Sequence, residues 1–178
     1  QHGFIAAVGF DLYCRLLDEA MRDLKGESVS ENPEPDVKIA VTAYIPDDYV
    51  PDGDQKMEFY QRLADAHRIV DLLAIREEME DRFGRLPYQA RSLMHIMEIR
   101  VMSRQLGLDA VHLEKSRFRL VFPEDRQLSP ADVQRMVEKC SSQLEFDIGE
   151  RLSIEIRVQG RDEIERLEKA RDTLEEIL

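Results

Sequence analysis

The sequence predicts an α+β domain, in which an antiparallel sheet of hairpins has its helices packed on one side. Two long helical patterns fill residues 69–108, and short alternating runs follow in two pairs after residue 108. The regular strand–helix alternation of a doubly wound fold is absent from the sequence. A length of 178 residues with 43% hydrophobic side chains suits one domain, or one domain with an appendage, around a sizeable core.

The first 36 residues divide into two segments. Residues 1–26 begin with small apolar side chains and continue from Phe10 as a helical pattern that ends at Gly26. Residues 27–36 lack periodicity and contain Pro33 and Pro35, which predicts a linker. The chain starts without methionine, and its first ten residues resemble the middle of a polypeptide. We therefore expect it to be a piece of a longer protein. The main domain is then residues 37–178.

A strand, a loop and a helix open this domain. Residues 37–44 alternate in polarity, as a strand does. The following loop has three turn-forming residues and four aspartates, and Tyr49 and Val50 are its expected anchors. Asp54 is the predicted N-cap of the helix that carries Met57 and Leu63.

The two central helices follow. Apolar residues recur at three- and four-residue steps from Ile69 to Phe83, and Gly84 suits the end of a helix. Pro87 fits the first turn of the next helix, and Gly107 is its expected terminator. The apolar stripe of this second helix is wide enough to predict cover on more than one side.

The last 70 residues are expected to form two strand pairs and two helices. Residues 110–113 and 118–122 are the first pair, and residues 144–148 and 152–158 are the second. Ser129, followed by proline, is a strong helix start. Asp162 and Glu165 have capping-box spacing before the final helix.

The charge balance bears on partners. The chain has 37 acidic against 25 basic residues and a net charge of -12, so phosphate backbones repel it and a basic protein surface attracts it. No apolar run is long enough to span a membrane. Cys14 and Cys140 give no disulfide framework, and a cytoplasmic location is expected.

Motifs for catalysis and cofactors are absent from the sequence. It has no phosphate-binding loop and no Gly-rich dinucleotide fingerprint, and its four histidines lack the spacing of metal ligands. The aspartates near Asp48 do not match a calcium loop. We therefore expect no catalytic residue, no cofactor and no metal in this chain.

One charge feature stands out, the acidic run Glu77, Glu78, Glu80 and Asp81. Such runs are usually a solvated helix face. The alternative is an acidic docking surface for a basic partner. Composition does not decide between these two interpretations.

Three stretches at these spacings resemble one family. They are HGFIAAVGFDLYCRLLDEAM at 2–21, AYIPDDYVPDGDQKMEFYQRLA at 43–64 and EEMEDRFGRLPYQARSLMHIMEIRVMSRQLGL at 77–108. They are similar to the C-terminal region of the bacterial transcription-repair coupling factor (Mfd) family. The resemblance covers about residues 2–125, and residues 126–178 match only loosely.

The resemblance implies a parent that is an ATP-dependent DNA translocase, with ATP and magnesium bound in an upstream motor domain. The parent removes stalled RNA polymerase and recruits nucleotide-excision repair. Residues 1–9 then resemble the tail of the motor, and residues 10–26 the connecting helix. The terminal domain of this family is a regulatory clamp that docks on an N-terminal repair-protein-like module and covers the surface for the repair subunit UvrA.

The resemblance also bears on the acidic run. It favours the docking interpretation, and we hypothesise that Glu78 and Asp81, with Glu77 beside them, pair with arginines of the N-terminal module. An alternative is a nucleic-acid-binding accessory domain, for which one local basic cluster is available: Arg100, Arg104, Lys115, Arg117 and Arg119. An independent enzyme is a third possibility, which a pocket with converging carboxylates would support.

Overall fold

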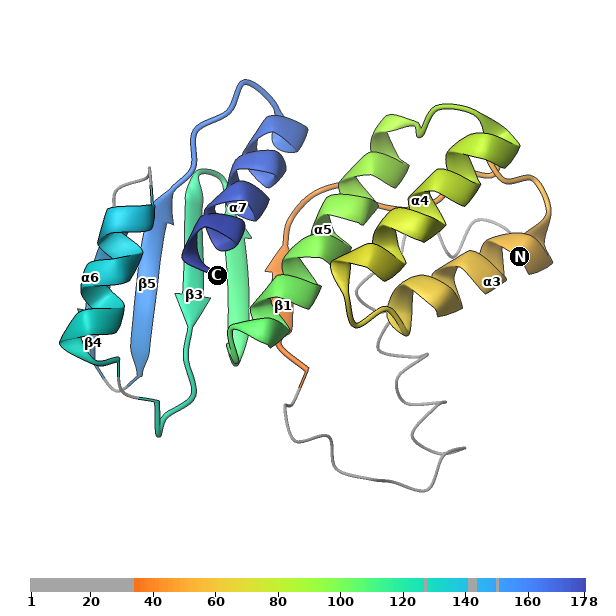
Figure 1. The fold of residues 1–178 in the computed structure, drawn as a ribbon. Coiled ribbons are helices and arrows are strands. Elements are labelled where there is room, and N and C mark those ends of the chain that lie inside the picture. The colour runs from red at the N-terminus through yellow and green to blue at the C-terminus, as the bar shows by residue number, and fades with distance from the viewer. Residues whose placement is uncertain (1–33, 127, 141–143, 150) are drawn as a thin grey trace. The chain divides into compact units, whose positions relative to one another are not determined.

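The computed structural model describes residues 34–126, 128–140, 144–149 and 151–178, in two compact units. One unit contains residues 42–97, and the other contains residues 34–41 and 98–178. Each unit is described by itself. The predicted motor tail, the connecting helix and most of the linker lie outside the described residues. The order of the described elements agrees with the order that the sequence predicts (Figure 1).

Three helices build the first unit: α3 (Gly53–Ala64), α4 (Ile69–Phe83) and the larger part of α5 (Tyr88–Gln105). The loop before α3 is anchored as predicted, because Val50 is fully buried. The predicted cap of α3 is wrong by two residues. The Asp52 side chain, not that of Asp54, accepts a hydrogen bond from the Gln55 backbone N–H, at 2.9 Å, and Asp54 lies in the first turn.

Helix α4 ends at Gly84, whose N–H donates to the Glu80 carbonyl at 2.9 Å. Gly84 has φ 83° and ψ -169°, a conformation that is essentially restricted to glycine. The chain then enters α5, and the Pro87 carbonyl accepts the first helical hydrogen bond, from Arg91. Every residue from Ser92 to Ile99 of α5 is buried, which confirms the prediction of a helix covered on more than one side.

The second unit is built on a five-stranded sheet in the order β1-β2-β3-β5-β4. The strands are β1 (Asp36–Ile39), β2 (Ala110–Glu114), β3 (Arg117–Val121), β4 (Leu144–Ile148) and β5 (Leu152–Arg157). Three of the pairings are antiparallel, as the hairpins predict. The fourth is not, because β1 pairs with β2 in parallel. The reason is the long connection through α3, α4 and α5, which returns the chain to the same end of the sheet before β2 begins.

Two helices, α6 (Pro130–Lys139) and α7 (Glu163–Ile177), lie over one face of this sheet (Figure 1). Ser129 caps α6 as predicted and also forms a capping box with Asp132, and Asp162 caps α7 by accepting from the Glu165 N–H at 2.8 Å. The core of this unit combines side chains of the covered sheet face with side chains of α7. Its fully buried members include Val111, Phe118, Leu120, Ile154, Ile156, Leu167, Ala170 and Leu174. The opposite face of the sheet carries mostly charged side chains.

Candidate docking site

The structure separates the three acidic residues singled out on α4. Glu77 and Asp81 are exposed and lie four residues apart, on the helix face opposite Met79, which is 1% exposed. Glu78 is turned by about 100° from Glu77 around the helix axis, since there are 3.6 residues per turn. That rotation directs Glu78 toward α3.

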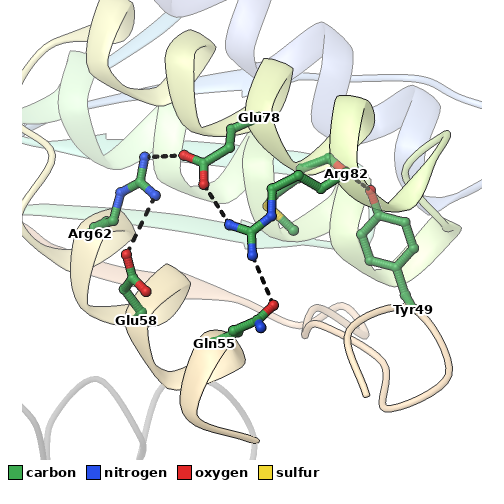
Figure 2. A network of polar contacts seen from close by, with 7 residues as sticks. Tyr49, Gln55, Glu58, Arg62, Glu78 and Arg82 are labelled. Carbon is green, nitrogen blue, oxygen red and sulfur yellow. Dashed lines mark hydrogen bonds and ion pairs between the residues drawn. The ribbon is translucent and has the colours of Figure 1, made fainter. Parts of the chain in front are cut away.

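Glu78 forms ion pairs within the unit (Figure 2). Its carboxylate lies 2.7 Å from an Arg62 guanidinium nitrogen and 2.7 Å from an Arg82 nitrogen. The hydrogen bond from Arg62, and to a smaller extent that from Arg82, holds the pKa of Glu78 below its ordinary value. The second Arg82 nitrogen donates to Gln55 at 2.8 Å. Glu78 therefore links α4 to two points of α3.

Aromatic rings stabilise the same arginines. The Arg82 guanidinium lies 5.1 Å from the Phe83 ring centroid and 5.5 Å from that of Phe59, and Arg62 is also 5.5 Å from Phe59. The two rings meet edge to face, with centroids 6.0 Å apart. Both arginines are thus held in place on α3 and α4. This arrangement explains why Glu78 is half-buried.

Tyr49 fastens the end of α4 to the loop before α3. Its hydroxyl donates to the Gly84 carbonyl at 2.7 Å and lies 3.0 Å from the Met79 carbonyl. Burial, with a smaller contribution from Glu80, raises the pKa of Tyr49 to about 12. The sequence predicts Tyr49 as an anchor, and these hydrogen bonds confirm it.

The exposed face of α4 combines acid and apolar surface. Among the described residues, neither Glu77 nor Asp81 has an ion-pair partner, whereas Glu80 lies 3.7 Å from Arg76. Val70 is 58% exposed and Leu73 is 44% exposed on the same side of the helix. Apolar side chains beside unpaired charges are typical of a protein-binding surface.

The basic cluster that the sequence offers for nucleic acid is largely neutralised. Glu34 binds both Arg100 and Arg104, at 3.0 Å and 2.8 Å. Arg119 lies 3.9 Å from Glu155 and 4.0 Å from Asp147. Lys115 and Arg117 are left without a carboxylate within 4.0 Å among the described residues.

The described ranges contain neither a metal-binding cluster nor a membrane-spanning helix. No group of three or more His, Cys, Asp and Glu side chains there is placed to hold a metal ion. None of the helices described has both the length and the apolar character needed to cross a membrane.

Sequence reasoning missed several residues of this site. Val70 and Leu73 could have been found, because both fall outside the apolar stripe that contains Leu72 and Met79. Of the partners of Glu78, Arg82 could have been found, because it lies four residues later on the same helix, whereas Arg62 could not. Arg62 precedes Glu78 by 16 residues on a different helix, and only the packing of α3 against α4 joins the two.

By fold, the chain is an α+β domain on a mixed sheet, and the notable residues of its candidate site are surface charges beside exposed apolar side chains. The chain belongs to the TRCF domain family, whose family model matches residues 39–133. Over 173 residues, which are 94% of the chain and 15% of the relative, it is 34% identical to the transcription-repair-coupling factor of Bacillus subtilis (strain 168). Over 139 residues, which are 78% of the chain and 12% of the relative, it is 32% identical to that of Myxococcus xanthus.

A solved structure supports the fold. The crystal structure of a C-terminal domain of transcription-repair coupling factor superposes with a TM-score of 0.70 at 20% identity, covering 84% of this chain and 97% of that one. The chain spans only 10–15% of the length of the curated relatives that it matches. Its similarity to them confirms the family resemblance that the sequence motifs indicate.

Glu78 predicts an acid-sensitive contribution to stability. Because its pKa is lowered in the folded state, its stabilising effect is present above the ordinary glutamate pKa and is lost as the pH falls through the lowered value. We expect Glu78→Gln to lower the melting temperature near pH 7 and to have a progressively smaller effect as the pH falls below the ordinary glutamate pKa. Thermal unfolding of both proteins across this range checks the prediction, and a difference that does not change with pH would contradict it.

Tyr49 predicts a change at the alkaline end. Tyr49→Phe removes the hydroxyl, which donates its one proton to the Gly84 carbonyl beside that of Met79, and should cost about 1 kcal/mol of unfolding free energy at neutral pH. The raised pKa means that this contribution is complete below the ordinary tyrosine pKa and is lost as the pH rises toward about 12. Urea unfolding at neutral and alkaline pH measures it. An equal difference at both would contradict the assignment.

Proposed function

We propose that this chain is the non-catalytic regulatory domain at the C-terminal end of an ATP-dependent DNA translocase that couples transcription to nucleotide-excision repair. Membership of the TRCF domain family supports this proposal. The domain acts as an autoinhibitory clamp. It docks on the N-terminal repair-protein-like module of the same polypeptide, while ATP and magnesium bind in the upstream motor.

The observation that carries the proposal is the exposed face of α4. Glu77 and Asp81 are one turn apart and have no ion-pair partner among the described residues, and exposed Val70 and Leu73 flank them. Two arginines on a partner could reach both carboxylates, because they project from one side of the helix. Apolar contact would then exclude water from the new ion pairs.

Glu78 has a different part in this proposal. Its carboxylate is already bound by Arg62 and Arg82. An incoming arginine at Glu78 would compete with two positioned guanidinium groups, which makes Glu78 a support of the docking helix and Glu77 with Asp81 the direct contacts. The docking acids are then Asp81 and Glu77, and Glu78 contributes by fixing the position of α4.

Calorimetric titration of this chain against the separately expressed N-terminal module tests the function. We expect saturable binding that weakens as salt increases, and no binding to duplex DNA titrated in parallel. Binding to DNA but not to the module would refute the clamp. If neither titrant binds, the next experiment fuses the module to this chain through a flexible linker. The linker supplies an effective concentration near the millimolar range, at which a weak contact becomes measurable. Absence of contact in the linked protein would also refute the clamp.

A further inference from the structure

We propose that the sheet unit has a second binding site, at the end where the β2–β3 turn meets the β5–α7 connection, and that it takes a short acidic segment of another protein (Figure 1). Four cations border this end, Lys115, Arg117, Arg157 and Arg166, and together they are called the basic corner. Arg117 and Arg157 lie on the sheet face opposite α7, whereas Lys115 and Arg166 line a pocket beside α7. The basic corner lies in the unit that does not contain α4. The inference is therefore independent of the proposed clamp.

Two of the four cations oppose each other across the sheet. Arg117 of β3 is in register with Arg157 of β5, and both side chains are exposed. Like charges directly opposite in an antiparallel pair destabilise it, because their Cβ atoms are only about 5 Å apart. Glu114 faces Arg117 from β2, but no ion pair within 4.0 Å joins them. The arginine pair therefore destabilises the isolated domain. An anion bound between the two guanidinium groups would relieve their repulsion.

The other two cations line a pocket at the same end of the sheet. This open pocket, of about 340 Å³, is lined by Lys115, Ser116, Gln159, Gly160 and Arg166. Arg166 projects from the first turns of α7, and its guanidinium is 3.4 Å from the Gly160 carbonyl. A Cβ on Gly160 would lie 2.7 Å from the Arg166 backbone nitrogen, so only glycine allows the connection to approach α7 this closely. The pocket shape depends on that approach.

Lys115 stands at the tip of the β2–β3 turn with φ 55°, a left-handed conformation that glycine or asparagine adopts more easily. A lysine here costs stability and gains no carboxylate partner within 4.0 Å among the described residues. With Arg166 and the two opposed arginines, it makes four cations at one end of a small sheet that have no carboxylate partner in the described structure. In a chain of net charge -12, such a cluster is a local reversal of sign.

The chemistry favours a short acidic protein segment as the occupant. Arginine binds carboxylates through two parallel hydrogen bonds, and two arginines side by side suit neighbouring Asp or Glu residues. A nucleic-acid backbone extends beyond the corner and would meet the acidic surface further along the same sheet face, including Glu145 and Glu155. A few carboxylates fit the corner without that repulsion.

The test is a titration of the isotope-labelled 178-residue chain with an octaglutamate peptide at low ionic strength, followed by the amide resonances. We expect shifts confined to residues 114–118 and 156–166. The double variant Lys115→Glu with Arg157→Glu should weaken binding about tenfold or more, since each cation supplies a charge-assisted hydrogen bond. The control, Arg126→Glu with Lys139→Glu, changes the net charge equally at exposed positions elsewhere in the unit and should keep the affinity.

A second measurement separates binding from folding. Arg157→Glu alone turns the opposed pair into an ion pair with Arg117, so the melting temperature should stay level or rise by about one to three degrees. A clear fall would show that Arg157 supports the sheet itself and would overturn the inference. So would equal affinity of the double variant and the native chain, or shifts spread over the whole surface. Corner shifts with a single-stranded oligonucleotide and none with octaglutamate would refute the acidic-segment occupant.

Discussion

Reversing the charge of Glu77 and Asp81 together, with Glu77→Arg and Asp81→Arg, should weaken binding of this chain to the N-terminal module by about 100-fold or more. Each carboxylate would lose a charge-assisted contact worth about 1.5–3 kcal/mol and would then repel the partner's arginines. Both side chains are exposed and unpaired in the described structure, so the fold should be unaffected. Calorimetric titration gives the affinity, and thermal unfolding confirms the fold.

The matched control reverses two exposed acids of the other unit, Asp125 and Glu175, for which the described structure shows no ion-pair partner. It alters the net charge by the same amount, so it reports the general electrostatic effect. Glu78→Gln is the complementary variant. It should lower stability more than it lowers affinity, because Glu78 bonds to Arg62 and Arg82 inside the unit. Unchanged binding by the Glu77 and Asp81 variant would show that the docking face lies elsewhere.

The different roles of these three acids show what sequence reasoning can and cannot reach. Helical periodicity is enough to predict α4 and its buried stripe, since it depends only on residues in the same element. The rotation that separates Glu78 from Glu77 follows from the same geometry. That Glu78 is bound by Arg62 depends on how α3 packs against α4, which no local pattern in the sequence encodes.

The same difference between local and long-range contacts explains which strand pairings could be predicted. Hairpins are local, so three antiparallel pairings were predictable from short alternating runs and their turns. The parallel pairing of β1 with β2 joins residues more than 70 positions apart, such as Val37 and Val111. The basic corner is equally non-local. Sequence reasoning found Lys115 and Arg117, which are neighbours in the chain, and missed Arg157 and Arg166, which only the sheet register and the start of α7 bring to the same place.

The N-cap of α3 shows a smaller difference between the prediction and the structure. Asp52 and Asp54 are equally good capping residues by type, and the sequence offers both within three positions. The structure uses Asp52, so that α3 begins at Gly53 and Lys56 is placed for an ion pair with Asp47. Asp54 then lies in the first turn, where an acidic side chain interacts favourably with the helix dipole. A difference of two residues at a helix start is decided by such neighbours rather than by propensity.

Gly84→Ala should lower the free energy of unfolding by about 1–3 kcal/mol, because Gly84 combines φ 83° with an extended ψ that side-chain-bearing residues avoid. A Cβ at this position would have no heavy atom within 4 Å, so the whole cost comes from the backbone and none from a clash. Both backbone polar groups of Gly84 also form hydrogen bonds. Its N–H ends α4 and its carbonyl accepts the Tyr49 hydrogen bond. Urea unfolding with an unchanged slope against denaturant measures the loss.

Gly53→Ala is the matched control for this prediction. Gly53 is the first residue of α3, has no left-handed φ, and has equally open space around a Cβ. Alanine there should be neutral or stabilising by up to about 1 kcal/mol, because it restricts the unfolded chain. Equal effects of the two substitutions would mean that Gly84 relaxes to an ordinary helix end. The Tyr49 bond would then not fix the last turn of α4, and the position of Asp81 would have to come from the packing of Met79 and Phe83 alone.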